Sequence, residues 1–152
     1  MVNLKAILIS IIIMITLMTG CITARTSDPV PALQIKAHPQ YYTLTMSSVP
    51  GIGLTPAYSP GIDNKTMSFR WQTDNGHFLS WSNSTVRDLG SDVTTDDTTV
   101  YWSYKPGDIG SDKPIAHVCL ELIDSASGHV IDTATLHIGW EDPYGVKVLN
   151  ST

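Results

Sequence analysis

Alternation of apolar and polar residues with a period of two constrains the fold of this chain more than any other feature. The clearest run spans residues 115–124, where Ala116, Val118, Leu120 and Leu122 fall on one face. Similar runs recur between turn residues spaced eight to twelve positions apart, and no segment after residue 32 has a helical period. The pattern predicts an all-β, two-sheet antiparallel sandwich of seven or eight strands.

The individual strands follow from this alternation and from the turn residues between the runs. We expect strands at residues 33–37, 41–49, 65–73, 77–81, 99–104, 115–124 and 129–140, with a short terminal one at 146–149. Asp74-Asn75-Gly76 is a tight-turn sequence, which predicts that the strands on either side of it form a hairpin. Residues 50–62, rich in Gly and Pro, and the polar, acidic stretch 82–98 are predicted to be irregular.

The first twenty residues have the organisation of a signal peptide. Residues 1–5 carry one positive charge, Lys5, and residues 6–18 are apolar or small. These thirteen residues are fewer than the roughly 20 needed to cross a hydrocarbon core. The following Leu17-Met18-Thr19-Gly20-Cys21 resembles the lipobox of prokaryotic lipoproteins, with Met18 where leucine usually stands.

The lipobox resemblance implies that cleavage leaves Cys21 as the first residue and that lipid on its thiol anchors the protein to a membrane. Acyl chains contribute about 0.8 kcal/mol per buried methylene group, so two chains anchor stably where one is marginal. The alternative is an uncleaved transmembrane anchor in which Cys21 is incidental. Both interpretations place the rest of the chain outside the cytoplasm.

Composition predicts how the remaining residues are organised. Residues 21–32 are rich in Thr, Ser, Asp and Pro, which indicates a flexible tether, and the domain is expected at 33–149 with a tail at 150–152. Removing 20 residues from 152 leaves 132, enough for one domain, and the loss of Lys5 changes the formal net charge from −5 to −6. No basic cluster is present, so we expect no binding to nucleic acid.

The middle of the chain is similar to prokaryotic Ig-like and polycystic-kidney-disease-like domains over roughly residues 33–140. The similarity rests on Trp71, Thr73-Asp74-Asn75-Gly76, Phe78, Cys119 and the turn Asp124-Ser125-Ala126-Ser127-Gly128. The chain has no second core cysteine to match Cys119, and the Gly-Asp-Gly turn of the polycystic-kidney-disease group is absent. The resemblance implies an Ig-like sandwich, a fold that carries many unrelated functions.

The titratable residues form no recognisable catalytic or metal-binding motif. No Cys-x-x-Cys, no Gly-x-Ser-x-Gly and no helical His pair with a glutamate occurs, so we expect no enzyme activity, no cofactor and no bound metal. His117 and His137 are the candidates should a metal bind, because both fall on predicted outward faces. Cys119, left without a disulfide partner if Cys21 is lipidated, is predicted to be a small buried hydrophobe.

Four aromatic residues are candidates for a binding surface: Trp81, Tyr101, Trp102 and Tyr104. Exposed aromatic patches mark contact sites for proteins and sugars, although rings of this kind also fill cores. The leading hypothesis is a membrane-anchored, non-enzymatic binding or structural module that contacts a surface protein or a glycan. The alternatives are an inhibitor of secreted peptidases that presents Pro50-Gly51-Ile52-Gly53, and a metal-binding surface domain.

Overall fold

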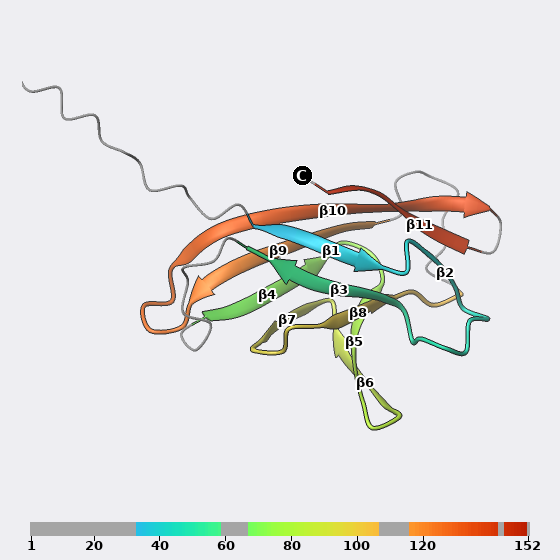
Figure 1. The fold of residues 1–152 in the computed structure, drawn as a ribbon, viewed down its shortest axis with the longest axis horizontal. Coiled ribbons are helices and arrows are strands. Elements are labelled where there is room, and N and C mark those ends of the chain that lie inside the picture. Colours follow the sequence, from blue (N-terminus) through green and yellow to red (C-terminus); the bar gives the residue numbers. More distant parts are fainter. Residues whose placement is uncertain (1–32, 59–66, 107–115, 143–144, 152) are drawn as a thin grey trace, which may run out of the picture. The chain divides into compact units, whose positions relative to one another are not determined.

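The structure, a computed structural model, describes residues 33–58, 67–106, 116–142 and 145–151. Cys21, together with the predicted signal peptide and tether, lies outside the described residues. Within them the chain forms eleven strands and no helix (Figure 1).

The strands form two antiparallel sheets. The first sheet has the order β1 (Gln34–His38), β3 (Ile52–Ala57), β8 (Val100–Ser103), β5 (His77–Ser82) and β6 (Thr85–Gly90). The second sheet has the order β2 (Tyr41–Thr43), β11 (Gly145–Ser151), β10 (Val130–Asp142), β9 (Ala116–Asp124), β4 (Met67–Thr73) and β7 (Asp92–Thr95). Every pair of neighbouring strands is antiparallel, as the prediction of an antiparallel sandwich requires.

Seven of these strands follow the order of a constant-type Ig sandwich. The series β1-β3-β8-β5 corresponds to strands A, B, E and D, and β10-β9-β4 corresponds to G, F and C. The other four strands, β2, β6, β7 and β11, extend the sheets at their edges. The predicted sandwich is therefore confirmed, and the predicted count of seven or eight strands is too low.

Two segments that were predicted to be irregular contain the missing strands. Residues 50–62 include β3, which pairs with β1 and β8 and buries Ile52 and Leu54 fully in the core. The acidic stretch 82–98 includes β6 and β7. Asn83 and Ser84, with φ of 50° and 62°, form the two-residue turn that leads from β5 into β6, and positive φ at both positions is the backbone that a tight hairpin needs.

The end of β2, the pairing of β5 and the end of β11 also differ from the sequence-based expectation: β2 ends at Thr43, whereas a strand was expected at 41–49. β5 does not form a hairpin with β4, because the chain crosses from the second sheet to the first at Asp74-Asn75-Gly76. β11 continues to Ser151, into the segment predicted to be a tail.

The residues of the hydrophobic core come from both sheets. The predicted inward face of β9 is confirmed, since Ala116, Val118, Leu120 and Leu122 are fully buried. The first sheet contributes Phe78, whose ring centroid lies 6.3 Å from that of Trp71 on β4. Each fully buried side chain of this size contributes about 1.5–3 kcal/mol relative to an exposed one. The packing of apolar side chains from both sheets therefore fixes the ends of the strands and the residues that connect them.

Candidate functional site

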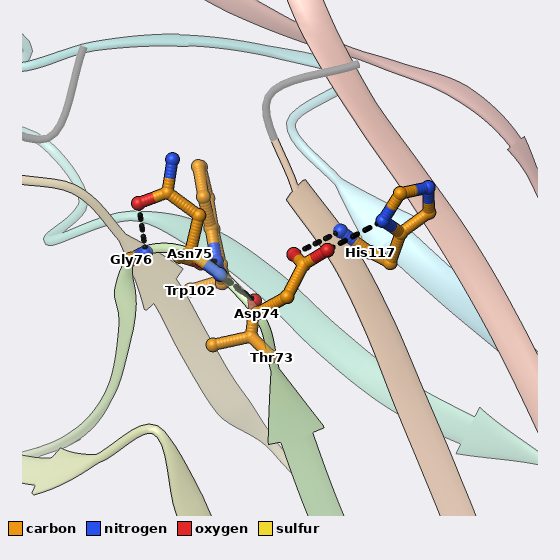
Figure 2. Close-up of polar contacts among 6 residues, drawn as sticks. All are labelled: Thr73, Asp74, Asn75, Gly76, Trp102 and His117. Atoms are coloured by element: carbon orange, nitrogen blue, oxygen red, sulfur yellow. Dashed lines mark hydrogen bonds and ion pairs between the residues drawn. The ribbon is translucent and has the colours of Figure 1, made fainter. Parts of the chain in front are cut away.

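The corner between β4 and β5 is built from Thr73, Asp74, Asn75 and Gly76 (Figure 2). The Thr73 hydroxyl donates to the Asn75 carbonyl oxygen at 2.6 Å, and the Asn75 side-chain oxygen accepts the Gly76 N–H at 2.8 Å. Gly76 has a φ of 77°, and a Cβ on it would lie 2.6 Å from the Ser103 carbonyl oxygen. Only glycine fits there without strain, so local chemistry and packing together fix this corner.

The corner presents the Asp74 carboxylate to His117 on β9. Oδ1 of Asp74 accepts the His117 backbone N–H at 2.7 Å, and Oδ2 lies 2.6 Å from the ring Nδ1 (Figure 2). Burial acts to raise the pKa of Asp74, but the hydrogen bonds from His117 outweigh it and leave that pKa below its usual value. Asp74 is therefore ionised at neutral pH and orients the His117 ring.

His117 faces His137 across the β9–β10 pair. The two residues are direct neighbours in the register, and their ring centroids lie 4.8 Å apart with the ring planes at 89°. The His117 side chain is 47% exposed. No group of three His, Cys, Asp or Glu residues in the described part of the chain is arranged to hold a metal ion. The structure thus brings the two sequence candidates together on the outer face of the second sheet.

Trp102 and Tyr104 lie in the core, with 0% and 3% of their surface exposed. The prediction that these two rings line a binding surface is wrong. Trp102 takes an inward position on β8, and its indole N–H donates to the Asn75 carbonyl oxygen at 3.0 Å. That acceptor satisfies the polar atom of a buried tryptophan, so the ring can be covered fully.

Trp81 and Tyr101 lie on the opposite, outer face of the first sheet. Trp81 is 41% exposed, and its ring contacts that of Tyr101 edge-on with centroids 5.6 Å apart. Gly53 leaves room for Tyr101, because a Cβ at Gly53 would lie 3.3 Å from the tyrosine ring. The Tyr101 ring therefore packs against the ring of Trp81, and Trp81 is the exposed residue of this pair.

Two grooves flank Trp81. One, of about 400 Å³, is lined with Met46, Ser47, Val49, Pro50, Ser84 and Val86. The other, of about 320 Å³, is lined with Ser80, Ser82, Asp97, Thr98 and Thr99. We call Trp81, Tyr101 and the second, hydroxyl-rich groove the Trp81 surface. A further groove of about 670 Å³ is lined by residues of β1, β10 and β11 and by Gln40, and its lining has no Phe, Tyr or Trp.

An ion-pair network lies on the outer face of the second sheet, across β9, β4 and the edge strand β7. Arg70 binds Asp92 through two hydrogen bonds of 3.0 and 2.7 Å and lies 3.5 Å from Glu121. These exposed contacts attach β7 to β4 and contribute little free energy each. Cys119 shares this face and is only partly buried, whereas the sequence predicted a small buried hydrophobe. Partial burial, with a smaller effect of Glu121, raises the pKa of the Cys119 thiol and so favours its protonated form.

Two features of these sites could not be found by sequence reasoning. The sequence indicates only a turn at Asp74, because its partner His117 is 43 positions away and no local spacing reveals the contact. Asp97 and Thr98 fall in the acidic stretch for which the sequence predicts irregular structure. Their position beside Trp81 depends on how β7 and β8 are connected, for which the sequence carries no local signal.

No protein-family model, curated protein or solved structure matches this chain. Within the described residues, no helix has the length and apolar character to cross a membrane. The lipobox resemblance of the first residues therefore stays a prediction.

Proposed function

We propose that this protein is a membrane-anchored extracytoplasmic lipoprotein whose sandwich binds a glycan at the Trp81 surface and catalyses no reaction. The observation that carries the proposal is the exposed indole of Trp81 beside a groove of hydroxyl groups. The lipobox-like sequence ending at Cys21 supports the location, since a lipid there would hold the domain close to the membrane.

The chemistry of the groove fits a carbohydrate better than an apolar peptide. A sugar ring offers a flat C–H face that packs on an indole, and its rim of hydroxyl groups needs donors and acceptors. The side chains of Ser80, Ser82, Thr98 and Thr99 supply both, and the Asp97 carboxylate supplies a strong acceptor. Binding sites of this kind combine an apolar contact with a few polar groups that fix the orientation.

The aromatic pair also lowers the cost of ordering the site. The edge contact with Tyr101 holds the Trp81 ring, and Tyr101 is itself packed over Gly53. A ring that is fixed before binding loses less side-chain entropy when a ligand covers it.

The test measures glycan binding by the full chain in detergent micelles, with a carbohydrate array followed by calorimetry on any positive glycan. Trp81 exposes 41% of its surface, about 100 Å² if a tryptophan presents about 250 Å². Covering half to all of that area is worth about 1.3–2.5 kcal/mol. Trp81→Ala should therefore weaken binding about 10- to 70-fold.

Val130→Ala is the matched control, because Val130 is 49% exposed and lies on β10 of the other sheet. Its glycan affinity should equal that of the unchanged protein. Equal affinity of the Trp81→Ala variant, or no glycan bound at all, would reject the proposed ligand. If the chain captures a protein partner and this capture depends on Trp81, the ligand of the surface is a protein rather than a glycan.

The proposed membrane anchoring through Cys21 is tested separately, in cells that express the full chain. Cys21→Ala should abolish incorporation of labelled fatty acid and release the protein from the membrane fraction. A Cys21→Ala protein that stays with the membranes would support the uncleaved anchor instead.

A further inference from the structure

We propose that His117 and His137 bind one divalent transition-metal ion, of the type that prefers imidazole, with Asp74 as the positioning residue. The two histidines are direct cross-strand neighbours on β9 and β10. This site lies on the second sheet, apart from the Trp81 surface on the first, so the inference is independent of glycan binding.

The separation of the rings matches that of two imidazoles on one ion. A metal–nitrogen bond of about 2.0–2.1 Å places each ring centroid about 3.2 Å from the metal. At ligand–metal–ligand angles between square and tetrahedral, two such centroids lie about 4.5–5.2 Å apart. The observed separation is 4.8 Å. Binding therefore requires rotation of the rings at most, without movement of the strands.

Asp74 sets which nitrogen of His117 is available. Its carboxylate oxygen lies 2.6 Å from Nδ1, so that nitrogen carries the proton and donates it to Asp74. The lone pair is then on Nε2, which points away from Asp74 in Figure 2. A carboxylate that accepts a hydrogen bond from the distal nitrogen of a metal-bound histidine orients the ring and increases its basicity.

The Asp74 carboxylate is itself held in one orientation by the backbone. Its Oδ1 accepts the His117 backbone N–H at 2.7 Å, and the following Asn75 and Gly76 complete the rigid corner. The carboxylate therefore meets the ring in one geometry, whether or not an ion is present.

The coordination sphere is open. No third His, Cys, Asp or Glu joins the pair among the described residues, so water fills the remaining positions. The partly exposed His117 ring gives the ion access from solvent. Such a site binds more weakly than a closed structural zinc site with four protein ligands.

The test titrates Cu²⁺, Ni²⁺ and Zn²⁺ into the untagged full chain in detergent micelles, followed by calorimetry. All proteins carry Cys21→Ser and Cys119→Ser, which removes both thiols of the chain as competing ligands. We expect saturable binding of one ion per chain. His137→Asn should abolish that binding, and Asp74→Asn should weaken it about 10- to 100-fold.

Spectroscopy and a matched control separate this site from non-specific binding. The electron paramagnetic resonance spectrum of the Cu²⁺ complex should show coupling to two nitrogen ligands, and this two-nitrogen spectrum should be absent in His137→Asn. His129→Asn, which removes an exposed histidine outside the site, should leave the affinity unchanged. Tryptophan fluorescence verifies that each variant is folded.

The proposal is overturned by either of two results with folded proteins. One is the absence of saturable binding of a single ion, and the other is binding that persists unchanged in His137→Asn. An affinity that is unaffected by Asp74→Asn refutes the positioning role of the carboxylate.

Discussion

Replacing Gly76 by alanine should destabilise the domain by about 2–4 kcal/mol. A left-handed backbone such as that of Gly76, with φ of 77°, costs an L-residue about 1–2 kcal/mol. The new methyl group would lie 2.6 Å from the Ser103 carbonyl oxygen and 2.7 Å from the Trp102 indole, and such overpacking costs about 1–3 kcal/mol. The lower entropy of the unfolded chain offsets about 0.4–1 kcal/mol. The expected loss is a large fraction of a typical stability of about 5–15 kcal/mol.

Two other glycines isolate the part of this loss that is due to packing. Gly90 and Gly128 have φ of 82° and 73°, and a Cβ on either would meet no atom within 4 Å. Gly90→Ala and Gly128→Ala should therefore cost only the conformational difference, about 1 kcal/mol or less after the entropy offset.

The assay is urea unfolding of the full chain, followed by the fluorescence of its four tryptophans. The free energy of unfolding of Gly76→Ala should fall below that of both control variants by at least about 1 kcal/mol. If all three substitutions cost the same, the corner is not held by contact with Ser103 and Trp102, and the reasoning is wrong.

The remaining predictions concern the two buried tryptophans and the ionised aspartate. The Trp71 indole N–H has no partner among the described residues, whereas that of Trp102 donates to Asn75. Trp102→Phe should thus lower the free energy of unfolding by about 1–3 kcal/mol more than Trp71→Phe, and equal losses in urea would contradict this. Because His117 lowers the pKa of Asp74 in the folded state, that carboxylate adds stability above its unfolded pKa, about 3.9, and loses it as pH falls through the lower folded value. The stability gap between the unchanged protein and Asp74→Asn should therefore shrink below about pH 4 in urea unfolding, and a gap independent of pH would refute it.

The central strands could be predicted because their local pattern and their environment agree. Within residues 115–124, every second residue from Ala116 to Leu122 is apolar. β9 lies between β10 and β4 in the sheet and buries one face, as the alternation requires. β6 could not be predicted in this way, since nearly all of its side chains are exposed and it has no apolar face. It forms because the Asn83-Ser84 turn directs the chain back along β5. An edge strand of this type depends on its partner more than on its own sequence.

Alternation also leaves open which of the two faces of a strand is buried. Tyr101 and Trp102 are adjacent on β8 and equally able to fill a core. The choice depends on groups that lie far away in the sequence: the Asn75 carbonyl oxygen accepts the Trp102 indole N–H, and Gly53 leaves space for Tyr101. The sequence therefore identified four aromatic candidates for a surface, and the tertiary contacts reduce the surface to Trp81 with Tyr101.

The same corner links the stability of the core to the proposed metal site. Asn75 receives a hydrogen bond from the core residue Trp102, and the adjacent Asp74 holds His117 on the outer face. An ion that binds only the folded protein stabilises it by an amount that grows with its concentration, about 2.7 kcal/mol at 100 times its dissociation constant. That gain is comparable to the loss expected from Gly76→Ala. If Gly76→Ala also displaces the Asp74 carboxylate, the ion must bind this variant less tightly. The gain in the free energy of unfolding on adding the ion will then be smaller in Gly76→Ala than in Gly128→Ala, where the site is intact.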